Sequence, residues 1–121
     1  MSKTRAKGTS FETEVVKFLQ SMGFLGTKRH VLNSPFGDID GIPMVLECKN
    51  HKEMALSEWM NQAAKSGEKA GKLHAVCHKR KGKGVSQAYV TMPLEVYAEL
   101  LRFYDGELSV DMEIIASDDD V

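Results

Sequence analysis

The stretch GDIDGIPMVLECKN, residues 37–50, decides the fold because it holds two short strand-like segments with a tight turn between them. It also places four charged side chains in an otherwise apolar setting, namely Asp38, Asp40, Glu47 and Lys49. Charges on adjacent strands cost desolvation and mutual repulsion unless a ligand offsets that cost. A divalent metal ion and a phosphate group would offset it, so the stretch indicates a functional site.

Side chains alternate across a strand, so residues two apart share a face. In MVLECK, residues 44–49, this predicts Glu47 and Lys49 on one face and the apolar side chains on the other, packed on the core. Asp38 and Asp40 share a face of the preceding segment, and a tight hairpin would bring at least one of them beside Glu47. The alternative is a surface hairpin whose charges only form salt bridges, but the apolar run favours an interior strand.

The acidic pair and the lysine suggest a specific chemistry. Two close carboxylates repel each other, and one then tends to stay protonated. Mg²⁺ relieves this conflict, because it binds one or two carboxylates together with water and phosphate oxygens. Lys49 would then orient or deprotonate the attacking water, or neutralise charge on the phosphoryl oxygens. The pattern therefore predicts metal-assisted hydrolysis of a phosphodiester bond.

The rest of the chain reads as alternating helices and strands in the order α-β-β-β-α-β-β-α, which indicates an α/β fold with a mixed sheet flanked by helices. Apolar side chains of the last helix are predicted to reach the core: Leu94, Val96, Tyr97, Leu100 and Leu101. Helices are predicted at 9–22, 57–70 and 93–104, and strands at 25–33, 38–42, 44–50, 73–80 and 86–92, with turns at 34–37 and 81–84.

The length of 121 residues predicts one domain, and the composition (42% hydrophobic, 27% charged) is typical of globular proteins. We expect a single domain at residues 1–116, with a mobile basic N-terminus at 1–8, and an acidic, disordered tail at 117–121. The chain shows no apolar run that would span a membrane and no signal core, so a cytoplasmic location is expected.

Charge is divided unevenly along the chain. Residues 1–83 hold 15 Lys and Arg against 8 Asp and Glu, whereas residues 84–121 hold one Arg and nine acids. The basic part suggests a polyanion partner, although the two parts would also neutralise each other within the fold. A DNA-backbone footprint is predicted for Lys7, Lys28, Arg29, Lys79, Arg80, Lys81 and Lys83. For KRKGKG, residues 79–84, the alternative is a solvated turn.

Cysteine and histidine indicate no metal centre of the zinc type. Cys48 and Cys77 form no CxxC motif and are predicted to be small buried hydrophobic residues. The four histidines show no zinc-ligand spacing, and structural or surface roles are expected for them. His51 lies just after Lys49 and is placed to contact DNA.

GDIDGIPMVLECK, residues 37–49, resembles the signature of the PD-(D/E)xK nucleases, the restriction-endonuclease-like superfamily, which carry an Asp, a Glu and a Lys on a β-hairpin. KGTSFETEVVKFLQSMGF (7–24) followed by KRH (28–30) resembles the opening of archaeal-type and phage-encoded Holliday junction resolvases. HAVCHKRKGKG (74–84) is similar to a later hairpin of phage-encoded members. The resemblance covers roughly residues 7–105 and implies a restriction-endonuclease-like core.

The resemblance implies catalytic and metal-binding roles for the hairpin residues. Glu47 and Lys49 match the E-x-K, and the G-x-I-D pattern selects Asp40 as the motif aspartate, with Asp38 as the alternative or as a helper. A metal ion would accordingly be held by Asp40, Glu47, Asp38 and the backbone carbonyl of Cys48.

Three further positions match residues of such families. Glu12 matches an early-helix glutamate that contacts metal or water, and its alternative is a capping box with Thr9. Gln62 resembles an accessory glutamine of RecB-like members, and its alternative is a plain surface residue. Arg29 lies on the basic first strand that borders the cleft in the family.

The function implied is that of an Mg²⁺-dependent DNA endonuclease, with Mn²⁺ as a substitute, that cleaves four-way junctions or other branched DNA as a homodimer. Its cellular location would be the cytoplasm, that of a bacterial host if the chain is phage-encoded. The alternatives are a RecB-like exonuclease, a single-strand or flap nuclease, an RNA-directed nuclease and a non-catalytic DNA-binding module. The dimer surface, or else the last core element, is expected at Phe103, Tyr104 and residues 110–116.

Overall fold

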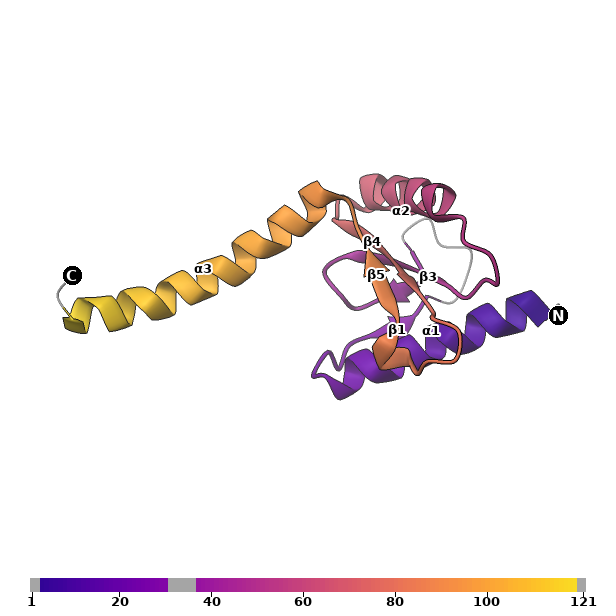
Figure 1. Cartoon of the computed structure of the whole chain (residues 1–121), viewed down its shortest axis with the longest axis horizontal. Coiled ribbons are helices and arrows are strands. Elements are labelled where there is room, and N and C mark those ends of the chain that lie inside the picture. Colours follow the sequence, from indigo (N-terminus) through magenta and orange to yellow (C-terminus); the bar gives the residue numbers. More distant parts are fainter. Residues whose placement is uncertain (1–2, 31–36, 120–121) are drawn as a thin grey trace.

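The computed structural model of the chain describes residues 3–30 and 37–119, and the side chains of residues 10–30 and 37–106. The described residues form three α-helices and two small sheets (Figure 1). This confirms the mixed α/β class and the predicted order of elements. The elements are α1 (Lys3–Ser21), β1 (Lys28–Arg29), β2 (Ile39–Asp40), β3 (Val45–Lys49), α2 (Leu56–Ala70), β4 (His74–His78), a 3₁₀ turn (Val85–Gln87), β5 (Tyr89–Thr91) and α3 (Leu94–Asp119).

The larger sheet has the strand order β3-β4-β5. β3 runs parallel to β4, from the pair Val45↔His74 to the pair Lys49↔His78, and β4 runs antiparallel to β5. A parallel pair needs a crossover connection, and α2 supplies it. β4 is therefore the central strand of this sheet. The edge of β3 that faces away from β4 accepts a hydrogen bond from Asp38, in the segment that precedes β3 in the chain.

The smaller sheet corrects the predicted hairpin. β2 pairs with β1 in antiparallel register and not with β3. A backbone hydrogen bond to β3 comes from the residue just before β2, where the Asp38 N–H donates to the Leu46 carbonyl at 3.2 Å. Ile39 of β2 still packs in the same buried cluster as Leu46 and Cys48 of β3, but among the described residues β2 and β3 form no strand ladder with each other.

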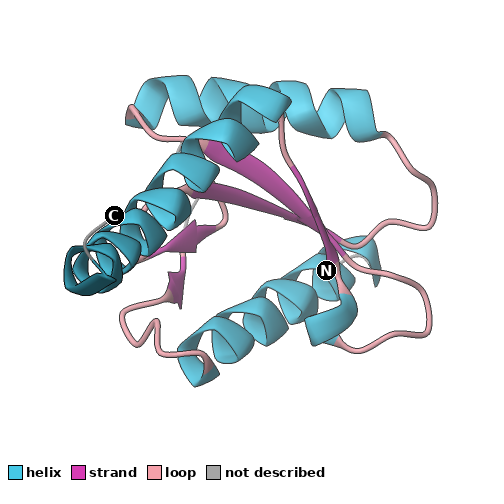
Figure 2. Ribbon diagram, turned by 60° about the vertical axis from the view of Figure 1, so that its left-hand side comes forward, coloured by secondary structure: helices cyan, strands magenta, loops and turns pink. Residues whose placement is uncertain are grey.

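A helix covers each face of the larger sheet (Figure 2). On one face, Phe11 and Val15 of α1 pack in a buried cluster with strand residues of alternating position, namely Leu46, Cys48, Ala75 and Cys77. On the other face, Trp59 and Ala63 of α2 pack on Val76. Cys48 and Cys77 are free and buried, as predicted. Glu47 and Lys49 therefore belong to the sheet face that α2 covers.

The bounds of α1 differ from the prediction at one end. The helix begins at Lys3, so the predicted start at Thr9 is wrong, and part of the segment predicted to be mobile is helical. Lysine, arginine and alanine are good helix formers, which accounts for the earlier start. The helix ends as predicted, with Gly23 at φ 104° and the Phe24 N–H bonded to the Leu19 carbonyl at 3.0 Å.

The last helix corrects a second prediction. α3 extends away from the body of the molecule (Figure 1) and continues to Asp119, through part of the predicted tail. Val96 is buried, but Leu94, Tyr97 and Leu101 are 79%, 49% and 45% exposed. These side chains do not reach the core, because the helix leaves the sheet after its first turn. Phe103 and Tyr104 are also exposed, and the side chains of 110–116 lie outside the described residues.

Within the described residues, all five strands are shorter than predicted, and β1 and β5 differ most from the prediction. β1 comprises Lys28–Arg29, and the remainder of the predicted strand and turn, residues 31–36, lies outside the described residues. The predicted strand at 86–92 becomes a 3₁₀ turn followed by β5. Within the described part of the chain, no helix combines the length and the apolar character that a membrane span requires.

Candidate functional site

The centre of the candidate site is the carboxylate of Glu47, in the middle of β3. The residue is only 3% exposed, although a carboxylate is among the most expensive groups to bury. Its Oε1 accepts a hydrogen bond from the Ser66 hydroxyl of α2 at 3.1 Å. Ser66 has no recognisable spacing to the hairpin motif, so sequence reasoning did not identify it. α2 thus provides a polar contact for the buried carboxyl group of Glu47.

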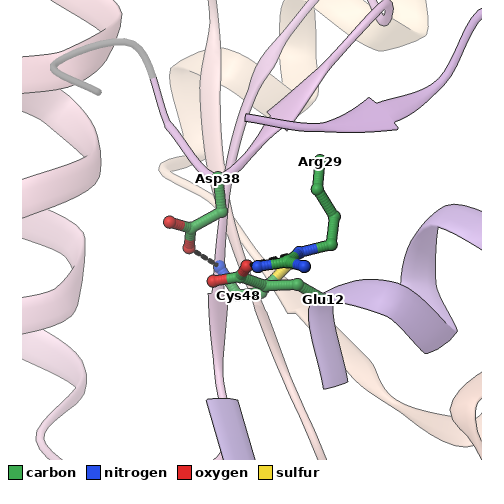
Figure 3. Close-up of polar contacts among 4 residues, drawn as sticks. All are labelled: Glu12, Arg29, Asp38 and Cys48. Atoms are coloured by element: carbon green, nitrogen blue, oxygen red, sulfur yellow. Dashed lines mark hydrogen bonds and ion pairs between the residues drawn. The ribbon is translucent and has the colours of Figure 1, made fainter. Parts of the chain in front are cut away.

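Asp38 is the aspartate that the structure brings to Glu47. The Cys48 N–H donates to Asp38 Oδ2 at 2.7 Å, which directs this carboxylate to the edge of β3 (Figure 3). The N–H and carbonyl of one strand residue point to the same edge of the strand, so the Cys48 carbonyl belongs to the edge of β3 that Asp38 contacts. The prediction that at least one aspartate would lie beside Glu47 is confirmed, and that aspartate is Asp38.

The proximity of the two carboxylates changes the protonation of Glu47. Burial is the largest cause, and together with the charge of Asp38 and a hydrogen bond with Asp38 it raises the pKa of Glu47 from an ordinary 4.5 to about 7. The Ser66 hydrogen bond and the Lys49 charge act in the opposite direction but do not cancel the effect. One proton is therefore retained near neutral pH, as expected for two close acids without a cation.

Asp40 occupies a different environment. Its two carboxylate oxygens lie 2.7 and 2.8 Å from Nδ1 of His30, and both side chains are partly exposed. The sequence favoured Asp40 as the motif aspartate because of the G-x-I-D pattern. The geometry instead pairs Asp40 with a histidine of the segment after β1, and leaves Asp38 as the partner of Glu47.

Glu12 of α1 forms an ion pair with Arg29 of β1, with Oε2 and Nε 3.2 Å apart (Figure 3). The capping box with Thr9 is wrong, since Thr9 lies inside the helix. Burial raises the pKa of Glu12, the Asp38 charge raises it further, and Arg29 and then Lys49 lower it. Glu12 is thus electrostatically linked to Asp38, and Arg29 borders the same group of acids.

Lys49 lies at the end of β3 and donates from Nζ to Oε1 of Gln62 on α2 at 2.7 Å. The two alternatives for Gln62 were a plain surface residue and a residue linked to the motif. Gln62 is exposed, yet its side chain holds the lysine of the E-x-K. A neutral acceptor constrains the ammonium group without neutralising its charge.

The oxygen donors of this site suit a hard divalent cation. Asp38, Glu47 and the Cys48 carbonyl offer two carboxylates and a backbone oxygen, and Mg²⁺ takes one or two carboxylates and completes its shell with water. Among the described residues, no group of three or more His, Cys, Asp or Glu side chains forms a ready metal cage.

The predicted basic residues fall into two places. Lys28 and Arg29 lie on β1, whereas Lys79, Arg80, Lys81 and Lys83 follow β4. Lys79 and Lys81 line a cavity of about 690 Å³ between α1 and the segments that follow β3 and β4. His51 and Lys52 line the same cavity; Lys52 was not predicted, although it lies three residues after Lys49. The side chain of Lys7 lies outside the described residues.

Comparisons with known proteins give no independent assignment. No family model, curated protein or solved structure matches the chain.

Proposed function

We propose that this protein is a metal-dependent DNA endonuclease with a restriction-endonuclease-like core, and that it hydrolyses phosphodiester bonds in branched DNA. The observation that carries the proposal is the contact of Asp38 with the edge of β3 beside the buried Glu47. Two such carboxylates conflict in the absence of a cation, and a fold gains no stability from the conflict. The order of elements and the helix on each sheet face agree with the core that the resemblance implies.

The residues would divide the chemistry between them. Asp38, Glu47 and the Cys48 carbonyl would hold Mg²⁺ or Mn²⁺, which supplies charge neutralisation at the phosphate and acidifies water. Lys49 would orient the attacking water or stabilise charge on the phosphoryl oxygens, with Gln62 fixing its position. Glu12 and Arg29 lie at the border of this group, where Arg29 would contact a phosphate and Glu12 would hold it in place.

The cavity of about 690 Å³ between α1 and the segments after β3 and β4 supports DNA as the substrate. Lys79 and Lys81 line it together with Lys52, and these cations suit the negative backbone of a strand that runs past the ends of β3 and β4. Such phosphate contacts give affinity without reading sequence. We therefore expect binding that weakens steeply with salt and depends on DNA shape rather than on a base sequence.

Two copies of the chain would place two sites on opposing strands of a junction. Exposed apolar side chains on α3, among them Leu94, Tyr97 and Leu101, are available for such a contact. Light scattering of the purified protein measures its mass directly. A monomer at all accessible concentrations would remove the homodimer from the proposal and leave the hydrolytic chemistry in place.

The test is cleavage of a labelled four-way junction, beside linear duplex and closed circular DNA, with and without Mg²⁺. We expect metal-dependent cuts in the junction, with Lys49→Ala and Asp38→Asn each reducing the rate by roughly 100-fold or more. Asp40→Asn serves as the matched control and should cost less than about tenfold, because Asp40 contacts His30 instead of Glu47.

Several outcomes would contradict parts of the proposal. Degradation that needs a free DNA end and spares the circle would indicate an exonuclease. Binding of the junction without any metal-dependent cutting would indicate a non-catalytic module. If Asp40→Asn abolishes cleavage and Asp38→Asn does not, the assignment of the metal ligand from the geometry is wrong.

A further inference from the structure

A second, smaller cavity of about 240 Å³ lies directly beside Lys49. Its lining combines aromatic rings with basic side chains, among them His51, Trp59, His78, Arg80 and Tyr89. Pockets that enclose a whole drug-sized molecule measure roughly 300–1,000 Å³. This cavity therefore fits a part of a larger ligand, at a position next to the lysine that we assign to the chemistry.

The rings form a continuous series across the cavity. The His51 and Trp59 centroids are 5.4 Å apart, those of Trp59 and His78 are 6.0 Å apart, and those of His78 and Tyr89 are also 6.0 Å apart. The series ends with the Arg80 guanidinium, which lies 4.3 Å from the centroid of the Tyr89 ring. Rings and guanidinium planes at such distances are the surfaces on which nucleobases stack.

The members of this series differ in exposure. Trp59 is buried and packs on Ala63 and Val76, so a structural role accounts for it. Tyr89 is 54% exposed, and His51 is exposed as well, so packing within the core does not explain their rings. The buried rings hold the exposed ones in place, which limits the entropy that a ligand would have to overcome on stacking.

The charge of the cavity fits the same kind of ligand. Among the described residues, its lining contains Lys49, Lys52, Lys79, Arg80 and Lys81 and no aspartate or glutamate. Lys52, Lys79, Lys81 and His51 also line the larger cavity. A polyanion that follows the larger cavity would thus pass the opening of the smaller one. Cationic walls around stacked rings are characteristic of sites for single-stranded nucleic acid.

We propose that this cavity binds an unpaired nucleotide of the DNA strand close to the cleaved phosphate, with its base stacked against Tyr89 and Arg80 and its phosphates on the lysines. The proposal rests on the proposed nuclease function and names the feature of the substrate that it selects. A paired base has both faces covered by its neighbours in the duplex, whereas an unpaired base offers its faces to a ring. Flaps, gaps and open branch points would therefore be preferred over intact duplex.

The test is fluorescence anisotropy with a labelled single strand, the same strand with one abasic position, and the corresponding duplex, all in EDTA so that no cleavage occurs. We expect the single strand to bind more tightly than the duplex. Tyr89→Ala should weaken single-strand binding by roughly 5- to 150-fold, which is the range for loss of one base stack. Tyr89→Phe should retain most of the affinity, because it keeps the ring.

Phe24→Ala is the matched control, since Phe24 is a similarly exposed aromatic residue after α1 and is not among the lining residues of either cavity. The abasic strand tests the same contact without any change to the protein. A set of strands carries the abasic site at each position in turn. At one position at least, the missing base should weaken binding to the native protein. The strand with that abasic position should bind Tyr89→Ala about as well as the complete strand does, because this variant has already lost the stacking contact.

The outcomes separate this inference from the nuclease proposal. If Tyr89→Ala binds single strands as well as the native protein and still cleaves branched DNA, the nucleotide site is wrong and the nuclease stands. If single strands bind in the expected Tyr89-dependent way but no DNA is cut with metal, the nuclease is wrong and the site stands. Equal affinity for single strand and duplex would also overturn the inference.

Discussion

Glu47→Gln is expected to stabilise the metal-free protein at pH 8, although it removes a residue of the proposed active site. In the native protein, burial and Asp38 raise the pKa of Glu47 to about 7. Above that pH the folded state must hold an ionised carboxylate next to Asp38, in a place that is only 3% exposed. An amide has nearly the same shape and carries no charge, so it avoids this repulsion and still reaches Ser66.

The sign and size of the effect follow from linkage. Below pH 4.5 the Glu47 carboxyl is protonated in the folded and in the unfolded chain, and it makes no difference to stability. Between pH 4.5 and 7 the folded state binds more protons than the unfolded state, so the free energy of unfolding falls as the pH rises. The difference between 4.5 and about 7 for the Glu47 carboxyl corresponds to about 3 kcal/mol.

The assay is urea unfolding of both proteins in EDTA at several pH values from 5 to 8, a range chosen to bracket the pKa of about 7. We expect the native protein to lose up to about 3 kcal/mol across this range and Glu47→Gln to lose much less. Glu58→Gln, an exposed glutamate on α2, is the control and should change stability by less than about 0.5 kcal/mol. Added Mg²⁺ should stabilise the native protein at pH 8 and have little effect on Glu47→Gln.

A flat pH profile for the native protein would refute this reasoning. So would a Glu47→Gln protein that is destabilised equally at pH 5 and pH 8. Either result would mean that the residues around Glu47 already compensate its charge. The main physical support for a metal ion at this place would then be lost.

Two further predictions concern the support of the site. Gln62→Ala should lower kcat for cleavage about tenfold and leave DNA affinity unchanged, and Gln62→Glu, which keeps an oxygen acceptor for Lys49, should recover part of the rate in single-turnover assays. Gly41→Ala should destabilise the protein by at least about 1–3 kcal/mol, because φ is +83° and an added Cβ would lie 2.0 Å from the Gly26 carbonyl oxygen. Gly23→Ala, with φ +104° and open space around it, should cost less in the same thermal unfolding experiment.

Local patterns in the sequence were sufficient for the order of elements and for most of the core. Phe11 and Val15 have the four-residue spacing of one helix face, and α1 buries both. Alternation predicted the apolar side chains of residues 44–49 for the core, where Leu46 and Cys48 pack with α1. The same rules do not report how far a helix continues after it leaves the sheet. The apolar side chains of α3 have the spacing of a packed helix, yet Leu94 remains 79% exposed and Tyr97 49% exposed.

The choice between Asp38 and Asp40 shows why the site was harder to predict than the fold. The two residues are two positions apart, so alternation gives both of them the same face and cannot distinguish them. The two aspartates differ in their position relative to the two sheets, because Asp38 contacts both of them and Asp40 lies within the smaller one. The Asp38 N–H donates to the Leu46 carbonyl at 3.2 Å, and the Asp38 carbonyl accepts from the His30 N–H at 3.0 Å.

Asp38 is therefore the residue whose backbone is fixed to β3 on one side and to the segment after β1 on the other. Its side chain has to lie at that junction, next to Cys48 and Glu47. Asp40 lies beyond it, in a strand already paired with β1, and Gly41 continues the chain away from β3 with its backbone packed against Gly26. These are contacts between segments distant in sequence, and no local motif contains them. A sequence motif can thus identify the acids of such a site, while the pairing of the strands decides which acid acts with Glu47.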